Sequence, residues 1–181
     1  WKFSRRRLTA EEIRDSMLQI SGELNSTLTG ESVITPVDPE LVKLLYKPDQ
    51  WAVTKDPAEH NRRSTYLIAK RNLKLPFMEV FDQPDLQSSC ECREVSTHAP
   101  QALELLNGEF SNRMAARFAT RLEKISRGSE PQLVDSAFEL ATGRGPTTKQ
   151  REAAMVFLQS GLPTRELALA LFNLNAFLYV E

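Results

Sequence analysis

The sequence of 181 residues is poor in cysteine, with only Cys90 and Cys92. Two cysteines are too few for a disulfide scaffold, and the single residue between them places them poorly for a bond to each other. No apolar run approaches the roughly 20 residues that cross a bilayer, and no signal peptide is visible. Because the chain opens at Trp1 without a Met, we expect a piece of a longer protein, so the missing signal excludes no compartment.

An excess of charge of either sign is also missing. Lys and Arg number 23 against 24 Asp and Glu, which leaves a net charge of -1. General nucleic-acid binding depends on an excess of positive charge that releases counterions, so this class of function is excluded. The chain does contain 41% hydrophobic residues, which is enough for a sizeable core. Its length favours a single domain.

Helical periodicity dominates both ends of the chain. Thr9 followed by Glu12 is a capping box, and apolar residues at helical spacing then predict a helix over residues 9–24. Thr147 with Gln150 repeats the capping box and predicts a helix through residue 159. Glycine and proline separate the other predicted helices, which cover residues 39–46, 100–107 and the stretches around 114–125, 133–141 and 167–178. Short connections between them favour antiparallel neighbours.

We therefore predict a mainly α fold, an antiparallel helical bundle-like domain with a long irregular central segment. The predicted single domain, residues 1–181, has a helical N-terminal element at 9–24, an irregular motif-bearing segment at 25–98 and a helical C-terminal half at 99–181. Residues 64–73 fit a strand or a short buried helix, and periodicity does not decide between them. Residues 76–97, with two prolines, are predicted to be irregular, and long ordered loops often carry function.

Six polar residues in and beside this irregular segment are candidates for a binding site. Arginine matches carboxylate, sulfate and phosphate with two parallel hydrogen bonds. The favoured alternative is structural: because the net charge is balanced, the arginines, including those at positions 5–7, would pair with Glu12, Asp15 or Asp82. The candidate binding residues are Arg62, Arg63, Arg71, Asp82, His98 and Gln101.

Three residues could suggest a metal or a nucleophile: Cys90, Cys92 and His98. A zinc site usually has four Cys or His ligands, with two or more residues inside each pair, so we predict no metal site and no cofactor in this chain. A Cys90 thiolate with His98 as its base would need a hydrogen bond that sequence spacing cannot establish. Asp82 and Asp85 could do acid–base work or hold a hard cation. Beside Pro84, a turn is the more common use of such carboxylates.

A series of short motifs, in order along the chain, resembles a known family. The chain is similar to the C-terminal domain of unknown function of planctomycete-type, cytochrome-c-associated multidomain surface proteins. The motifs include Arg62-Arg63-Ser64-x-Tyr66, Phe81-Asp82-x-Pro84-Asp85, Pro100-Gln101-Ala102-Leu103, Gly143-Arg144-x-Pro146-Thr147 and Leu171-Phe172-Asn173-x-Asn175-x-Phe177-x-Tyr179-Val180, with further matches at residues 5–8, 10–15, 70–71, 76–78, 90, 97 and 106–107.

The resemblance implies an extracytoplasmic bacterial protein with an upstream companion domain. A cytochrome-c-like domain further upstream would carry any haem, and the family is linked by context to complex polysaccharide breakdown. The resemblance supplies no catalytic residues for this chain. Two positions depart from the pattern: Cys92 replaces a frequent Arg, and Ala176 replaces the usual Glu of the terminal motif.

Two functions follow as hypotheses, and no particular reaction does. The first is a structural or interaction module that completes the upstream companion domain, with residues 1–7 continuing directly from it. The second is part of a catalytic or binding site for acidic or sulfated polysaccharide, built from the six candidate residues. The expected partners are the upstream domains and, in the second case, polysaccharide.

Overall fold

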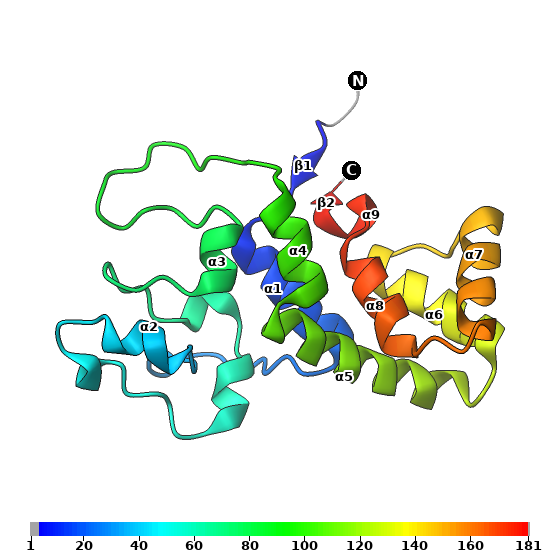
Figure 1. The fold of residues 1–181 in the computed structure, drawn as a ribbon, viewed down its shortest axis with the longest axis horizontal. Helices are drawn as coiled ribbons and strands as arrows, with labels where there is room; N and C mark the ends of the chain where they lie inside the picture. The colour runs from blue at the N-terminus through cyan, green and yellow to red at the C-terminus, as the bar shows by residue number, and fades with distance from the viewer. Residues whose placement is uncertain (1–3, 181) are drawn as a thin grey trace.

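The computed structural model describes residues 4–180, and the fold is mainly helical, as predicted (Figure 1). Residues 1–3, where the expected link to a companion domain would begin, lie outside the described residues. The described helices are α1 (Ala10–Ser21), α2 (Pro39–Lys43), α3 (Pro76–Val80), α4 (Ala99–Asn107), α5 (Glu109–Ser126), α6 (Glu130–Thr142), α7 (Thr148–Gln159), α8 (Thr164–Phe172) and α9 (Asn175–Leu178).

The core forms around α5, which packs against α1, α6 and α8. Phe118 of α5 is fully buried and stacks on Phe172 of α8, with ring centroids 6.2 Å apart. Ile13 and Met17, one turn apart on α1, are also fully buried. Burial of each such side chain contributes about 1.5–3 kcal/mol, so contacts between the two predicted helical parts stabilise the fold.

Both capping boxes are confirmed. The Thr9 hydroxyl accepts from the Glu12 amide while the Glu12 carboxylate accepts from the Thr9 amide, and Thr147 with Gln150 repeats this arrangement at α7. The left-handed conformation of Gly22, with φ of 80°, ends α1 at Ser21, three residues earlier than predicted.

Three local predictions need correction. Residues 64–73 form neither a strand nor an α-helix, but a 3₁₀ turn at Ser64–Tyr66 followed by isolated bridges. The segment predicted to be irregular from residue 76 begins with α3, because Pro76 fits a first helical turn and Phe77 and Met78 are buried. The last helical stripe is split into α8 and α9, since the backbone at Leu174 is extended, with ψ of 139°.

Two short strands close the fold at its ends. β1 (Arg6–Arg7) pairs antiparallel with β2 (Tyr179–Val180), and Arg6 lies opposite Val180. Two residues per strand are too few to stand out as period-two alternation, so the sequence did not predict this pair. It brings the two ends of the described chain side by side (Figure 1).

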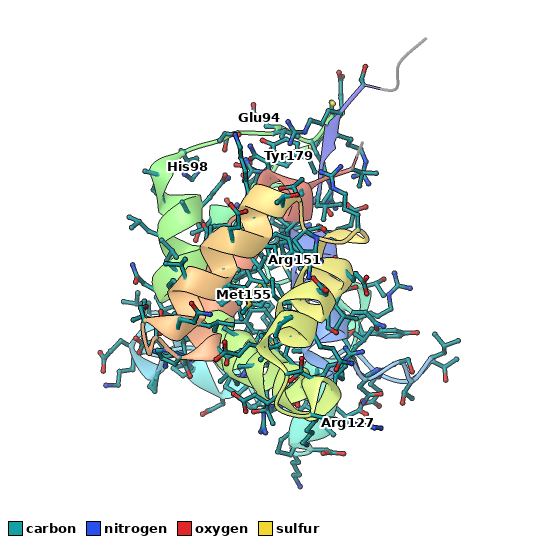
Figure 2. The ribbon with its side chains drawn as sticks, turned by 90° about the vertical axis from the view of Figure 1, so that its right-hand side faces the viewer. Glu94, His98, Arg127, Arg151, Met155 and Tyr179 are labelled. Atoms are coloured by element: carbon teal, nitrogen blue, oxygen red, sulfur yellow. The ribbon has the colours of Figure 1, made fainter. Side chains whose placement is uncertain are left out.

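The central segment forms a lobe separate from the helices of the C-terminal half. We call residues 25–75 the central lobe; it holds α2 and 3₁₀ turns at Pro48–Gln50, Pro57–Asn61 and Ser64–Tyr66. It lies across the molecule from α7 (Figure 1). Arg151 joins α7 to α6 by an ion pair with Asp135, with both nitrogen–oxygen distances 2.7 Å (Figure 2). Among residues 4–180, no helix is long and apolar enough to span a membrane.

Candidate functional site

The six candidate binding residues lie in several separate surroundings. Within residues 4–180, no hydrogen bond or ion pair joins Arg62, Arg63 or Arg71 to any of the other three. Arg71 and His98 are exposed, the latter at the start of α4 (Figure 2). The predicted convergence of all six on one ligand is therefore not the arrangement in this fold.

Arg62 is buried inside the central lobe, where it binds the lobe's own backbone. Its guanidinium donates to the carbonyl oxygens of Thr27 (3.2 Å) and Thr29, and to the Glu59 carboxylate (3.1 Å). It also lies 3.8 Å from the centroid of the Tyr66 ring. Its Nε is buried without a hydrogen-bond partner among the described residues. The side chain has a structural role, as the favoured alternative proposed, but its partners are Glu59 and backbone carbonyl groups rather than Glu12, Asp15 or Asp82.

Arg14, which the sequence analysis did not single out, joins the lobe to α1. Its guanidinium donates to the carbonyl oxygens of Arg62 (2.9 Å) and His60 (2.6 Å) and to the Ser64 hydroxyl (3.1 Å). Burial lowers the pKa of Arg14 to about 10, and the nearby Asp15 carboxylate partly opposes that shift. Its position in the apolar stripe of a helix was the signal that a buried arginine was present there.

Asp82 and Gln101 do meet, in a polar network beside α4. The Asp82 carboxylate accepts from the Ser96 amide (2.8 Å), the Ser96 hydroxyl (2.7 Å) and the Gln101 amide group (3.3 Å). Gln101, 2% exposed, also donates to the Val80 carbonyl oxygen at 3.0 Å. Asp82 takes up a left-handed backbone conformation, with φ of 61°. Arg7 of β1 donates to the Ser96 carbonyl oxygen, so the network fastens this loop to the end of the chain.

The network makes stability depend on pH. Burial would raise the pKa of Asp82, but the hydrogen bonds from Ser96 and Gln101 outweigh it and hold the pKa below its ordinary value of 3.8. The carboxylate therefore stabilises the fold above that value, and the contribution is lost as pH falls through the lower, folded pKa. We expect Asp82→Asn to cost about 1 kcal/mol at pH 7 and less at an acidic pH well below the ordinary value of 3.8.

Urea unfolding of the unchanged chain and of Asp82→Asn, at pH 7 and at the acidic pH, measures this difference in stability. Asp85→Asn is the control, because Asp85 is exposed in the same segment and its contacts are the Gln87 amide, the Ser88 hydroxyl and a weak ion pair with Lys74 at 3.9 Å. A deficit of the Asp82 variant that stays constant across this pH range would contradict the assignment.

The cysteines are exposed free thiols on the loop that precedes α4. The Cys90 sulfur lies 3.1 Å from the Cys92 carbonyl oxygen. Within the described residues, neither thiol forms a hydrogen bond with the His98 imidazole. No group of three or more metal-type ligands is found within residues 4–180.

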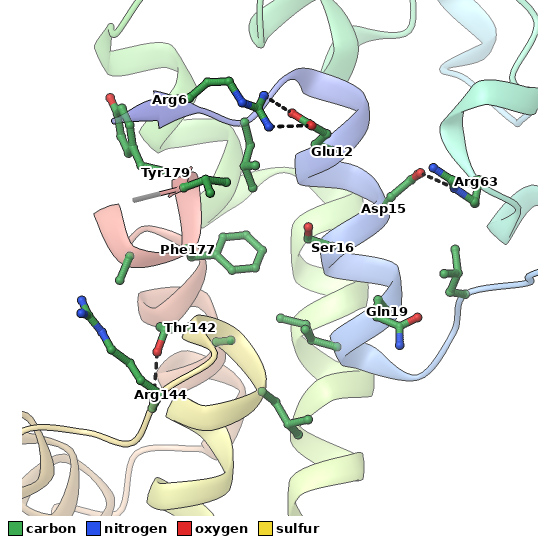
Figure 3. A pocket seen from close by; sticks show the side chains of 17 residues that line it. Arg6, Glu12, Asp15, Ser16, Gln19, Arg63, Thr142, Arg144, Phe177 and Tyr179 are labelled. Atoms are coloured by element: carbon green, nitrogen blue, oxygen red, sulfur yellow. Dashed lines mark hydrogen bonds and ion pairs between the residues drawn. The ribbon is translucent and has the colours of Figure 1, made fainter. Parts of the chain in front are cut away.

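A cleft of about 750 Å³ opens elsewhere, between α1, the end of α6, and α9 with β2 (Figure 3). Its lining combines apolar and polar side chains. The lining residues are Arg6, Leu8, Glu12, Asp15, Ser16, Gln19, Ile20, Leu24, Arg63, Leu140, Ala141, Thr142, Arg144, Ala176, Phe177, Tyr179 and Val180. Of the six predicted residues, only Arg63 lies here.

Both carboxylates of the cleft already have partners in the protein. Arg6 donates to the two Glu12 oxygens at 2.8 and 2.9 Å, and this hydrogen bonding, led by Arg6, lowers the pKa of Glu12 to about 2. Asp15 accepts from the amide and the hydroxyl of Ser64, both at 2.7 Å, and its other oxygen lies 3.5 Å from the Arg63 Nε. The Arg144 side chain, by contrast, is exposed and has no partner among the described residues.

Sequence reasoning missed this cleft because its lining comes from segments far apart in the chain. The motif at residues 143–147 was the available signal, since its Arg144 is not needed for the turn that the neighbouring glycines and proline form. Ala176, one of the two departures that the sequence analysis noted, also lines the cleft.

The fold and the cleft define a mainly helical domain with an open cleft of mixed polar and apolar lining. The chain belongs to the PSD1 family of proteins of unknown function, DUF1553, whose family model matches residues 1–158. No curated protein and no solved structure matches the chain significantly.

Proposed function

We propose that this domain is a structural and interaction module of an extracytoplasmic, multidomain bacterial protein of the planctomycete type. In this proposal the central lobe packs against the companion domain of the same protein. The family match supports a domain of unknown function of this family. The sequence resemblance described above supports the multidomain class, the partner and the compartment.

The exposed apolar side chains of the central lobe carry the proposal. Tyr46 is 94% exposed and Leu44 is 81% exposed, with Leu28 and Val53 also exposed in the same lobe. None of the side chains of α2 is buried. Grouped exposed apolar residues mark interaction surfaces, and tyrosine is enriched among the residues that dominate binding energy.

The buried arginines explain how such a lobe keeps its shape. Arg14 and Arg62 satisfy backbone carbonyl groups that apolar packing leaves open, so the lobe is ordered although it buries little apolar surface. A surface that is ordered before binding loses less entropy when it docks. The alternative, an acidic polysaccharide held by the six predicted residues, has less support because Arg62 and Gln101 are occupied by protein groups.

The test is a binding measurement between this chain and the companion domain, expressed separately. The double variant Leu44→Ser/Tyr46→Ser should weaken binding by about tenfold or more, because it removes two large apolar contacts. Its thermal unfolding should be unchanged, since both side chains are exposed.

Val156→Ser is the matched control, because Val156 is 66% exposed on α7, across the molecule from the lobe. Equal affinities of the double variant and the unchanged chain would refute the lobe as the contact. No binding by the unchanged chain would refute the companion domain as its partner.

A further inference from the structure

The cleft between α1, the end of α6 and β2 has the size and chemistry of a ligand site. Its volume of about 750 Å³ falls within the range of about 300–1,000 Å³ typical of binding pockets. Leu24, Leu140, Ala141 and Ala176 line it and are only half-buried. A ligand with an aliphatic part would therefore cover apolar surface that now faces solvent.

The charges of the cleft favour an acidic ligand. Glu12 and Asp15 already pair with Arg6 and with Ser64, so neither carboxylate presents an unpaired negative charge to a ligand. Two arginines remain for a ligand. Arg144 has no side-chain partner among residues 4–180, and Arg63 is 57% exposed, with a single weak contact to Asp15 at 3.5 Å. They lie on opposite sides of the opening (Figure 3).

The aromatic side chains of the cleft do not offer the open ring face on which sugars commonly stack. Phe177 is only 5% exposed. The guanidinium groups of Arg5 and Arg7 lie 4.5 and 5.7 Å from the centroid of the Tyr179 ring. Half-buried aliphatic side chains beside occupied aromatic rings suit a peptide side chain better than a pyranose ring.

We propose that this cleft binds an acidic peptide segment, with its aliphatic side chains against those of the cleft and its carboxylates paired with Arg144 and Arg63. Because these two arginines lie on opposite sides of the opening, they would select a segment with acidic residues at both ends (Figure 3). This site differs from the contact proposed for the central lobe, because Arg63 is the one residue of the lobe that lines the cleft.

The test uses a library of labelled peptides that have acidic residues on both sides of two aliphatic residues. A matched library carries lysine in place of the acidic residues, and oligogalacturonate serves as an acidic glycan probe. Binding is followed by fluorescence polarisation, and backbone amide chemical shifts locate the site. We expect acidic peptides to bind and to shift the amides of residues 140–144 and 176–180.

Arg144→Glu should weaken this binding by about tenfold or more, because it turns an attractive charge into a repulsive one. Arg71→Glu is the matched control: Arg71 is also exposed but lies outside the cleft. Unchanged thermal unfolding of both variants shows that each still folds. The proposal is overturned if lysine peptides bind as well as acidic ones, or if only oligogalacturonate binds. Absence of binding, or equal loss in the two variants, overturns it as well.

Discussion

Replacing Arg62 by alanine should lower the free energy of unfolding by about 2–4 kcal/mol. The change removes hydrogen bonds from a charged, buried group to two carbonyl oxygens and a carboxylate, and such bonds contribute about 1.5–3 kcal/mol each before relaxation. The loss should be concentrated in the lobe, where Val33 is the one fully buried side chain of residues 25–35 and most of the others are exposed. Urea unfolding measures the total, and amide hydrogen exchange locates it.

Arg63→Ala is the control next to it in the sequence. Its side chain is 57% exposed and makes one contact, at 3.5 Å, so the variant should stay within about 0.5 kcal/mol of the unchanged chain. If the two variants lose the same stability, the different burial of these neighbours has no energetic consequence, and the account of the lobe is wrong.

Gly108→Ala should destabilise the fold by about 1–3 kcal/mol, the usual cost of overpacking. Gly108 joins α4 to α5, and its amide donates to the Glu104 carbonyl oxygen at 2.8 Å. A Cβ at this position would lie 2.5 Å from that same backbone oxygen, closer than real contacts allow. The junction must therefore shift, which disturbs the packing of α5. Thermal or urea unfolding measures the effect.

Gly145→Ala is the matched control within the same chain. A Cβ there would meet nothing within 4 Å, and its backbone is not in the left-handed region. This variant should be neutral or up to about 1 kcal/mol more stable, because alanine has fewer conformations in the unfolded chain. If both changes destabilise the fold equally, the close contact at Gly108 adds no cost of its own, and the prediction is wrong.

Interactions between residues close in sequence were predictable, and those between distant residues were not. Thr9 with Glu12 and Thr147 with Gln150 are three positions apart, so a helix start is readable directly from the sequence. The pairing of β1 with β2 joins residues 6 and 180, and nothing in either pair of residues identifies its partner. The mainly helical class was therefore predictable, whereas the closure of the fold was not.

The candidate site shows the same limit at the level of single side chains. Arg62 and Arg63 form one motif, yet one is 2% exposed and the other is on the surface. The extended backbone at Arg62 turns successive side chains to opposite faces, which a list of residue types does not reveal. The buried partners of Gln101 and Asp82 depend on the path of residues 83–96, which has no periodicity to read.

The pairing of β1 with β2 also determines how the domain responds to mechanical force. Because Arg6 lies opposite Val180, the chain enters and leaves at the same end of the two-stranded ribbon. Tension applied through both termini would load its hydrogen bonds one after another, as in a zipper, rather than all together. The first part to yield under tension would then be the wall of the cleft that holds Tyr179 and Leu8, while the core around α5 stays intact.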